Sequence, residues 1–286
     1  MSNYPYPQYP LAYADALGIR TAYYSAGEPD GRPVVLLHGM STSADSFREL
    51  MHELAADHWL IAPDIPGFGY SENTKPYTVP HLVEWLAAFQ DALELPPMAL
   101  VGHSFGGLLA ASFALDYEED VTGMVLLAPA LLSAESYPDF LKRVGFSLGL
   151  VELGSTLSQS RLMVKRQIKV PFYDPSSQHA SVWERRLKDY ELARASAAVL
   201  RAVAFHNLRP HLKRVHQPVR LIWGENDPVV PVSDADELAG LFPHADVHRL
   251  AKCGHVPILE HRRQVAERVR HFLHTCCAAS PSWINS

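Results

Sequence analysis

The sequence predicts an α/β fold in which a mostly parallel β-sheet carries helices on both faces. Short, almost wholly apolar runs recur along the chain, as expected for strands buried inside a parallel sheet. Segments with the apolar spacing of amphipathic helices separate most of these runs. From about residue 133 to residue 212 the strands stop and only helical patterns remain, broken by prolines. This order indicates a helical cap inserted after the sixth strand.

Length, composition and charge limit the classes of protein to which the chain can belong. Its 286 residues suffice for one large α/β domain with an inserted sub-domain. An apolar fraction of 48% is typical of a soluble globular protein, and a net charge of −6 gives no reason to expect nucleic acid as a partner. No apolar run approaches the length of a membrane span, and the Tyr/Pro-rich start lacks the pattern of a secretory signal. With only three cysteines, two of them adjacent, we expect a cytoplasmic protein without a disulfide framework.

The chain begins with a loose lead and an antiparallel edge. Prolines within residues 1–10 exclude a helix there. Two strand-like runs follow at 11–16 and 19–25, joined by a turn at Leu17-Gly18 and with no helix between them. We therefore expect them to pair antiparallel at one edge of the sheet.

The remaining elements follow in regular alternation. Strands are expected at 33–37, 59–62, 98–101, 124–128, 219–224 and 246–250, and helices at 43–58, after Thr78, after Ser104, at 233–241 and at 260–274. Residues 1–132 and 213–286 then form the core, with loose ends at 1–10 and 276–286, and residues 133–212 form the cap. Such a cap would lie across the carboxyl-terminal edge of the sheet, where open α/β sheets bind their ligands.

The turn after the strand at 98–101 is the first candidate for chemistry. It reads Gly102-His103-Ser104-Phe105-Gly106-Gly107, a Gly-x-Ser-x-Gly pattern between an apolar strand and a helical pattern. Glycines suit this corner because the backbone turns sharply and the new helix packs close to the strand. The pattern predicts that Ser104 projects from a strained strand-to-helix turn.

A serine hydroxyl is a weak nucleophile, so it needs a histidine as base and a carboxylate that orients the histidine. Asp227 lies in the loop directly after the strand at 219–224, and His255 lies in the loop after the strand at 246–250. Glu225, on the same loop as Asp227, is its nearest rival. The order Ser104, Asp227, His255, each just past a strand, is the nucleophile–acid–histidine order of one known fold.

With these motifs the chain resembles the α/β-hydrolases, in the group that contains small esterases, C–C bond hydrolases and haloperoxidase-like esterases. The resemblance covers roughly residues 15–132 and 213–275 and is weaker over the cap. The motifs that carry it are Leu37-His38-Gly39, Asp64-x-x-Gly67-x-Gly69-x-Ser71, Gly102-His103-Ser104-Phe105-Gly106-Gly107, Gly224-x-x-Asp227 and Gly254-His255.

The resemblance implies roles for further residues. The backbone N–H groups of Met40 and Phe105 would form an oxyanion hole. A substrate pocket would be lined by the side chains of Met40, Phe105, Phe140, Val144 and Val256. His38 and His103 fit structural histidines beside the site, and Asp64 is expected to hold its glycine loop by accepting backbone hydrogen bonds. The scattered histidines lack metal-ligand spacing, so we expect neither a metal nor a cofactor.

The nucleophile narrows the reaction. Haloalkane dehalogenases and epoxide hydrolases of this resemblance carry aspartate where this chain has Ser104, which makes both activities improbable here. A serine with a histidine favours acyl transfer, so we expect a hydrolase of carboxylic esters with small to medium, largely hydrophobic acyl groups, working through an acyl-enzyme.

Three alternatives stay open from the sequence. The same triad serves lactonases and C–C bond hydrolases of the meta-cleavage product type, although the latter usually read His-Gly-x-Gly-Pro-Gly where this chain reads His38-Gly39-Met40-Ser41-Thr42-Ser43. A ligand-binding protein that has kept the pocket and lost catalysis is the remote third. The expected partner is a small-molecule ester, and a homodimer is left open.

Overall fold

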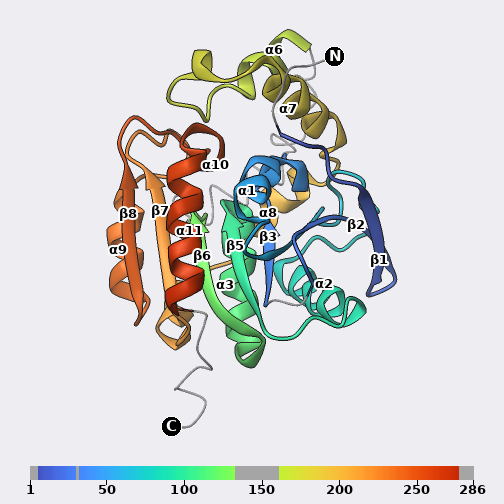
Figure 1. The fold of residues 1–286 in the computed structure, drawn as a ribbon, viewed down its shortest axis with the longest axis vertical. Coiled ribbons are helices and arrows are strands. Elements are labelled where there is room, and N and C mark those ends of the chain that lie inside the picture. The colour runs from blue at the N-terminus through green and yellow to red at the C-terminus, as the bar shows by residue number, and fades with distance from the viewer. Residues whose placement is uncertain (1–5, 30–31, 133–160, 277–286) are drawn as a thin grey trace.

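A computed structural model of the chain describes residues 6–29, 32–132 and 161–276 (Figure 1). Its eight strands form one sheet in the order β1-β2-β4-β3-β5-β6-β7-β8. β1 pairs antiparallel with β2, and β2 pairs antiparallel with β4, while the other neighbours are parallel. The strands are β1 Leu11–Ala16, β2 Ile19–Ala26, β3 Pro33–Leu37, β4 Trp59–Pro63, β5 Met98–His103, β6 Val121–Leu127, β7 Val219–Gly224 and β8 Ala245–Leu250. The predicted mostly parallel sheet with an antiparallel edge is confirmed.

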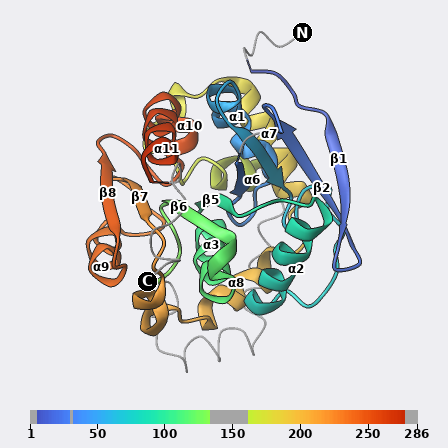
Figure 2. The same cartoon turned by 60° about the horizontal axis from the view of Figure 1, so that its bottom comes forward.

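Both faces of the sheet are buried under helices. Successive side chains of a strand point to opposite faces, so each buried strand contributes to the core on both sides. On β3, Val34 and Leu36 belong to one apolar cluster, and Val35 and Leu37 belong to the other. Figure 2 shows helices on both sides of the sheet. Helices α1 (Arg48–Leu54), α10 (Pro257–Glu260) and α11 (Arg262–Cys276) supply the first cluster, and α2 (Val79–Ala92), α3 (Phe105–Asp116) and α9 (Ser233–Leu241) supply the second.

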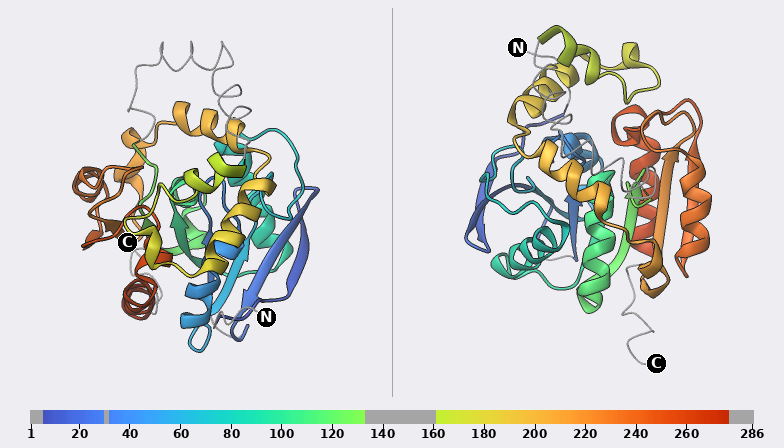
Figure 3. Two further views of the ribbon diagram at one scale, coloured as in Figure 1. Left: turned by 90° about the horizontal axis from the view of Figure 1, so that it is seen from above. Right: turned by 180° about the vertical axis from the view of Figure 1, so that it is seen from behind.

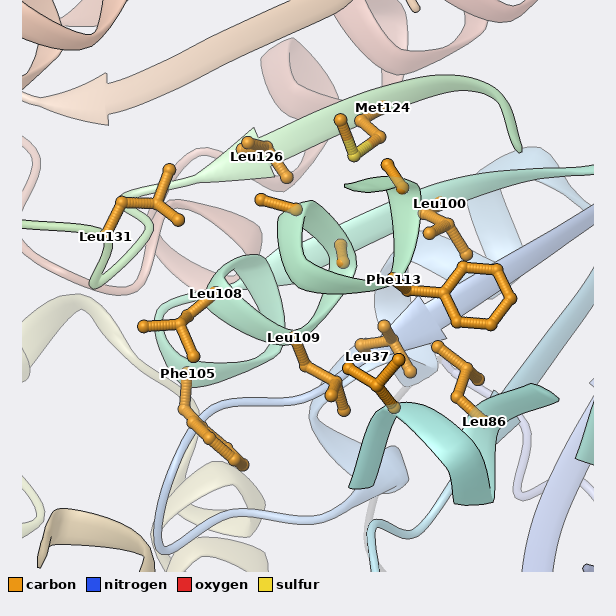
Figure 4. Close-up of a cluster of buried hydrophobic side chains, with 14 of the residues drawn as sticks. Leu37, Leu86, Leu100, Phe105, Leu108, Leu109, Phe113, Met124, Leu126 and Leu131 are labelled. Carbon is orange, nitrogen blue, oxygen red and sulfur yellow. The ribbon is translucent and has the colours of Figure 1, made fainter. Parts of the chain in front are cut away.

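Helix α3 is the most deeply buried helix of the core. Residues Phe105 to Ala114 are all buried, so the helix is apolar all round rather than amphipathic. Leu109 and Phe113 lie against Leu37 and Leu86 in the same cluster (Figure 4). This burial fixes the start of α3, and with it the turn at Ser104, against the middle of the sheet.

Two helices differ from their predicted extents. The helix expected at 43–58 begins as a 3-10 turn, Ala44–Phe47, and continues as α1 only to Leu54. The Ser43 side chain caps the 3-10 turn by accepting the Asp45 N–H, and the Arg48 N–H closes the turn on the Asp45 carbonyl. The final helix is divided into α10 and α11, because His261 between them lies outside helical geometry.

The described part of the predicted cap, residues 161–212, contains α6 (Arg161–Gln167), α7 (Ala180–Leu192), α8 (Ser196–Phe205) and the 3-10 turns Pro175–Ser177 and Arg209–Arg214. These helices lie over the end of the sheet at which the parallel strands terminate (Figures 1 and 3). The Ala195 N–H donates to the Gly67 carbonyl at 3.1 Å, and the His255 N–H donates to the Pro171 carbonyl at 2.7 Å. The division into core and cap and its boundaries stay a prediction.

Within residues 6–29, 32–132 and 161–276, every helix is too short or too polar to cross a bilayer.

Close packing at Gly106 predicts a large effect of one methyl group. A Cβ at this position would overlap the Leu37 carbonyl oxygen and lie 2.7 Å from the His38 carbonyl oxygen, both of them backbone atoms that cannot move aside alone. We expect Gly106→Ala to lower the free energy of unfolding by about 1–3 kcal/mol in urea titrations. In the control Gly240→Ala, on α9, the new Cβ meets nothing within 4 Å, so this variant should be neutral or up to about 1 kcal/mol more stable. Equal stability of the two variants would contradict the packing account.

Candidate active site

Ser104 lies at the turn between β5 and α3 in a conformation that few non-glycine residues adopt. Its φ is 53° and its ψ is −111°. Backbone hydrogen bonds to the neighbouring strand and loop hold this strained residue, since the Ser104 N–H donates to the Leu127 carbonyl at 2.9 Å and the Ala130 N–H donates to the Ser104 carbonyl at 3.1 Å. The glycine at 102 permits the turn, because a Cβ there would lie 2.5 Å from the Gly106 carbonyl oxygen. The half-buried Ser104 side chain therefore projects from the end of β5, as the sequence predicts.

Asp227 and His255, which lie in different loops, meet through a hydrogen bond. His255 Nδ1 and Asp227 Oδ2 are 2.7 Å apart, and the two side chains are 7% and 0% exposed. The second oxygen, Oδ1, accepts the N–H groups of Val229 and Val230 at 2.8 and 3.0 Å. Since a carboxylate accepts, Nδ1 carries a proton, and in the neutral imidazole Nε2 is then the nitrogen with the lone pair. The imidazole is thereby held in the tautomer that a general base requires.

Glu225, the rival carboxylate, is an exposed residue. The Asp227 side chain, in contrast, is buried and bonded to His255. The geometry thus brings together Asp227 and His255 from the ends of β7 and β8.

His103, next to Ser104, contacts the backbone of His255. Its Nε2 donates to the His255 carbonyl at 2.7 Å, and the two rings lie 5.0 Å apart between centroids. Burial, with the nearby His255, lowers the pKa of His103 to about 3. A histidine that stays neutral under ordinary conditions and holds a carbonyl suits a structural role, in agreement with the sequence-based expectation.

His38 and Asp64 organise the loops beside Ser104. His38 Nδ1 donates to the Gly39 carbonyl at 2.8 Å and Nε2 accepts the Ile65 N–H at 2.9 Å, and burial lowers its pKa to about 4. Asp64 accepts the N–H groups of Ala44 and Tyr70, each at 2.8 Å, and burial raises its pKa to about 6. The expectation that Asp64 holds its glycine loop through backbone hydrogen bonds is confirmed.

The proposed oxyanion donors lie on two adjacent backbone segments. Phe105 is the first residue of α3, and a helix provides no internal acceptor for the N–H at that position. Met40 follows Gly39, at which a Cβ would lie 3.4 Å from Ser104 Cβ, so the loop after β3 runs directly beside the serine. This nearness is what an oxyanion hole at Met40 and Phe105 requires.

The side chains predicted to line a substrate pocket have different surroundings. Phe105 and Val256 are each 1% exposed and belong to the two apolar clusters, and the half-buried Met40 packs against the cluster of Phe105. Phe140 and Val144 lie outside the described residues. The pocket role of all five stays a prediction.

A cavity of about 510 Å³ lies between the loop after β3 and the cap helices. Its described lining includes Ser41, the neighbour of Met40, but neither Ser104 nor His255. Ser41 Oγ is 2.8 Å from Ser196 Oγ on α8, so the cap contacts the predicted oxyanion loop directly. The other lining residues are Arg161, Val164, Leu187, Tyr190, Glu191, Ala193, Arg194, Ser196 and Ala197, a set with mixed polarity.

Polar contacts between α7 and residues 43–49, from Ser43 to the start of α1, were not predicted from the sequence. The Ser43 hydroxyl donates to Asp189 Oδ1 at 2.5 Å, and Arg185 forms ion pairs with Asp45 and Glu49. These partners are separated by about 140 residues, and each looks like an ordinary helix or loop residue in the sequence. Only the fold brings them together.

Comparisons with known proteins agree with the fold described above. The model of the alpha/beta hydrolase fold family matches residues 32–262. The pimeloyl-[acyl-carrier protein] methyl ester esterase of Xanthomonas oryzae pv. oryzae is 30% identical over 253 residues, which cover 85% of this chain and 95% of that protein. A putative lipase from Acinetobacter baumannii AYE superposes with a TM-score of 0.82 at 22% identity, covering 94% and 92% of the two chains. The meta-cleavage product hydrolase CumD from Pseudomonas fluorescens IP01 gives a TM-score of 0.74 at 25% identity, covering 92% and 97%.

The sheet, the turn at Ser104 and the family match define the class. The chain belongs to the alpha/beta hydrolase fold family, and its relatives are hydrolases, among them esterases and lipases.

The buried Asp189 predicts a pH-dependent stability. Burial raises the pKa of Asp189 from 3.8 to about 7. Between about pH 4 and 7 the folded protein therefore holds a proton that the unfolded chain has released, so this group lowers the free energy of unfolding as pH rises, by up to about 1.4 kcal/mol per pH unit. Asp189→Asn does not titrate, so its stability relative to wild type should increase from pH 4 to 7 and then level off.

Urea titrations of both proteins across this pH range check the prediction. The control for removal of an exposed carboxylate is Glu267→Gln on α11. A difference between Asp189→Asn and wild type that stays constant from pH 4 to 7 would contradict the prediction.

Proposed function

We propose that the protein is a serine hydrolase that cleaves carboxylic esters with small to medium, largely hydrophobic acyl groups, using Ser104, His255 and Asp227. The observation that carries the proposal is the buried hydrogen bond between His255 Nδ1 and Asp227 Oδ2, at 2.7 Å, in the loops beside the strained turn at Ser104. The same three residue types in the same chain order serve acyl transfer in this fold.

The first half of the reaction forms an acyl-enzyme. His255 Nε2 takes the proton of Ser104 as Oγ attacks the ester carbonyl carbon, and Asp227 stabilises the imidazolium that results. The negative oxygen of the tetrahedral intermediate accepts the N–H groups of Met40 and Phe105, each such donor contributing about 3–4 kcal/mol. His255 then gives its proton to the leaving alkoxide.

The second half returns the enzyme to its starting state. His255 removes a proton from water, which attacks the acyl carbon of the acyl-enzyme, and the same N–H groups stabilise the second oxyanion. When the intermediate collapses, Ser104 Oγ takes back the proton and the carboxylic acid leaves. No step uses a metal or a cofactor.

Ester substrates are supported by the esterase of Xanthomonas oryzae at 30% identity. A cavity of about 510 Å³ beside Ser41 has room for a substrate group of modest size. The mixed lining of this cavity fits an ester that carries polar atoms on one side of the scissile bond.

A second candidate is cleavage of a C–C bond in a meta-cleavage product by the same triad. The likeness to CumD, at 25% identity over nearly the whole of both chains, favours it. The loop after β3 argues against it, because His38-Gly39-Met40-Ser41-Thr42-Ser43 lacks the additional glycine and proline usual in that class. Product analysis with a dienoic ring-fission substrate separates the two reactions, and turnover there without ester hydrolysis would replace the first proposal. Hydrolysis of a lactone, which is a cyclic ester, would show that the protein also has lactonase activity.

Removing the nucleophile should abolish turnover. We expect Ser104→Ala to lower kcat on p-nitrophenyl butyrate by about 10⁶-fold and to prevent covalent labelling by a fluorophosphonate. Ser112→Ala is the matched control. The Ser112 hydroxyl lies on α3, the helix after Ser104, and donates to the Leu108 carbonyl at 2.8 Å, so this variant should keep its activity and labelling. Full activity of Ser104→Ala would reject the assignment, and a folded wild-type protein without labelling would favour the ligand-binding alternative.

Of the two carboxylates on the loop after β7, only one should matter for catalysis. Asp227→Asn should lower kcat by about 10⁴-fold, because an amide donates toward Nδ1 and reverses the tautomer of His255. Glu225→Gln, at an exposed residue two positions earlier, should stay within about two-fold of wild type. Initial rates on the same ester measure both variants. The opposite ranking would make Glu225 the acid of the triad.

A further inference from the structure

The loop that carries His255 is joined to the segment before α7 by a bridging carboxylate. Glu260, the last residue of α10, accepts the Gly254 N–H on Oε1 at 2.9 Å and the Tyr173 N–H on Oε2 at 2.7 Å. The His255 N–H itself donates to the Pro171 carbonyl at 2.7 Å. Two hydrogen bonds, from the Tyr173 N–H to Glu260 and from the His255 N–H to Pro171, therefore connect residues 171–173 with residues 254–260, and the bond from the Gly254 N–H fixes Glu260 to its own loop.

These two segments are in direct contact, with no room between them. A Cβ on Gly254 would overlap the Pro171 carbonyl oxygen and lie 2.7 Å from the Tyr173 nitrogen. Phe172, between these two residues, is 5% exposed and packs in the same apolar cluster as Val256 and Leu259. The segment 171–173 is thus a fixed part of the surroundings of His255.

The backbone of His255 is held on both of its polar atoms. Its N–H binds the Pro171 carbonyl, and its carbonyl accepts from His103 Nε2 at 2.7 Å. His103 belongs to the turn of Ser104 and is fixed by the sheet. The bond to Pro171, by contrast, depends on where the segment 171–173 lies, and Glu260 ties this segment to the histidine loop in addition to the packing of Phe172.

We propose that Glu260 is a positioning residue for His255, which it holds in register with Ser104 by bridging the Gly254 and Tyr173 N–H groups. This inference rests on the proposed function, in which His255 is the base. The hydrogen bonds that Glu260 accepts from Gly254 and Tyr173 both come from backbone N–H groups, so it acts through the backbone of the histidine loop. The bridge requires both carboxylate oxygens as acceptors. Burial raises the pKa of Glu260, and the hydrogen bonds from the Tyr173 and Gly254 N–H groups act in the opposite direction by lowering it.

Replacing one acceptor by a donor tests the bridge without changing its length. In Glu260→Gln the amide nitrogen must face one of the two N–H groups, so one of the hydrogen bonds is lost. We expect kcat for p-nitrophenyl butyrate and the rate constant of fluorophosphonate labelling to fall together by about 10- to 100-fold, with KM within two-fold of wild type. Glu260→Asp, which has both oxygens on a shorter side chain, should fall in the same direction. The matched control is Glu267→Gln at an exposed residue of α11, which should behave as wild type.

Two further measurements separate positioning from unfolding and from failure of the proposed function. The fraction of sites titrated at long labelling times should be unchanged in Glu260→Gln, so a loss of rate that equals a loss of titratable sites would overturn the proposal. Proton NMR of the downfield Nδ1–H of His255, assigned by its disappearance in Asp227→Asn, should shift or broaden in Glu260→Gln and not in Glu267→Gln. An unchanged resonance with unchanged rates would also overturn it. If wild type hydrolyses no ester but the resonance still responds to Glu260→Gln, the positioning role stands and the proposed function fails.

Discussion

The close approach of helix α3 to the ends of β3 and β5 is the constraint on which the rest of the structure depends. At Gly102 and Gly106 the backbones pack with no room for a methyl group, and Ser104 between them adopts a positive φ. A strained residue persists only where its surroundings over-determine it, and here a helix buried from Phe105 to Ala114 and the backbone hydrogen bonds of Ser104 do so. The same packing brings the first N–H of α3 beside the loop after β3, which is the arrangement an oxyanion hole needs.

Polar contacts, in addition to apolar packing, join residues 161–212 to the loops that carry the candidate site. They reach the loops after three strands: Ser196 contacts Ser41 after β3, Arg194 donates to the Gly69 and Ser71 carbonyls after β4, and Pro171 accepts from His255 after β8. Hydrogen bonds are directional, so they fix loop positions more narrowly than apolar packing does. The part of the chain that surrounds the cavity is therefore also the part that holds the loops of the candidate site.

Features that follow from local pattern could be predicted from the sequence. The buried strand at 33–37, the serine turn and the position of Asp227 and His255 after strands follow from apolar runs, turn chemistry and motif order. The role of Asp64 was predictable for the same reason, since one of its backbone donors, the Tyr70 N–H, lies in the glycine loop beside it.

Features that depend on distant partners could not be predicted. Glu260 and Asp189 each look like an ordinary helix residue, and only folding places them against Tyr173 and Ser43. The predicted α-helix at 43–58 was too long at its start because Ser43 caps a 3-10 turn there, and α1 itself runs only from Arg48 to Leu54. Side-chain lining of the substrate pocket is the hardest to predict, since it depends on how the cap segment packs.

The most direct test of the central claim is a crystal structure of the protein after reaction with a fluorophosphonate, which leaves a tetrahedral adduct resembling the oxyanion intermediate. The account predicts phosphorus bonded to Ser104 Oγ, the phosphonyl oxygen within about 3 Å of the Met40 and Phe105 nitrogens, and His255 Nε2 within hydrogen-bond distance of the adduct. An adduct on another residue, or a phosphonyl oxygen turned away from both nitrogens, would contradict it.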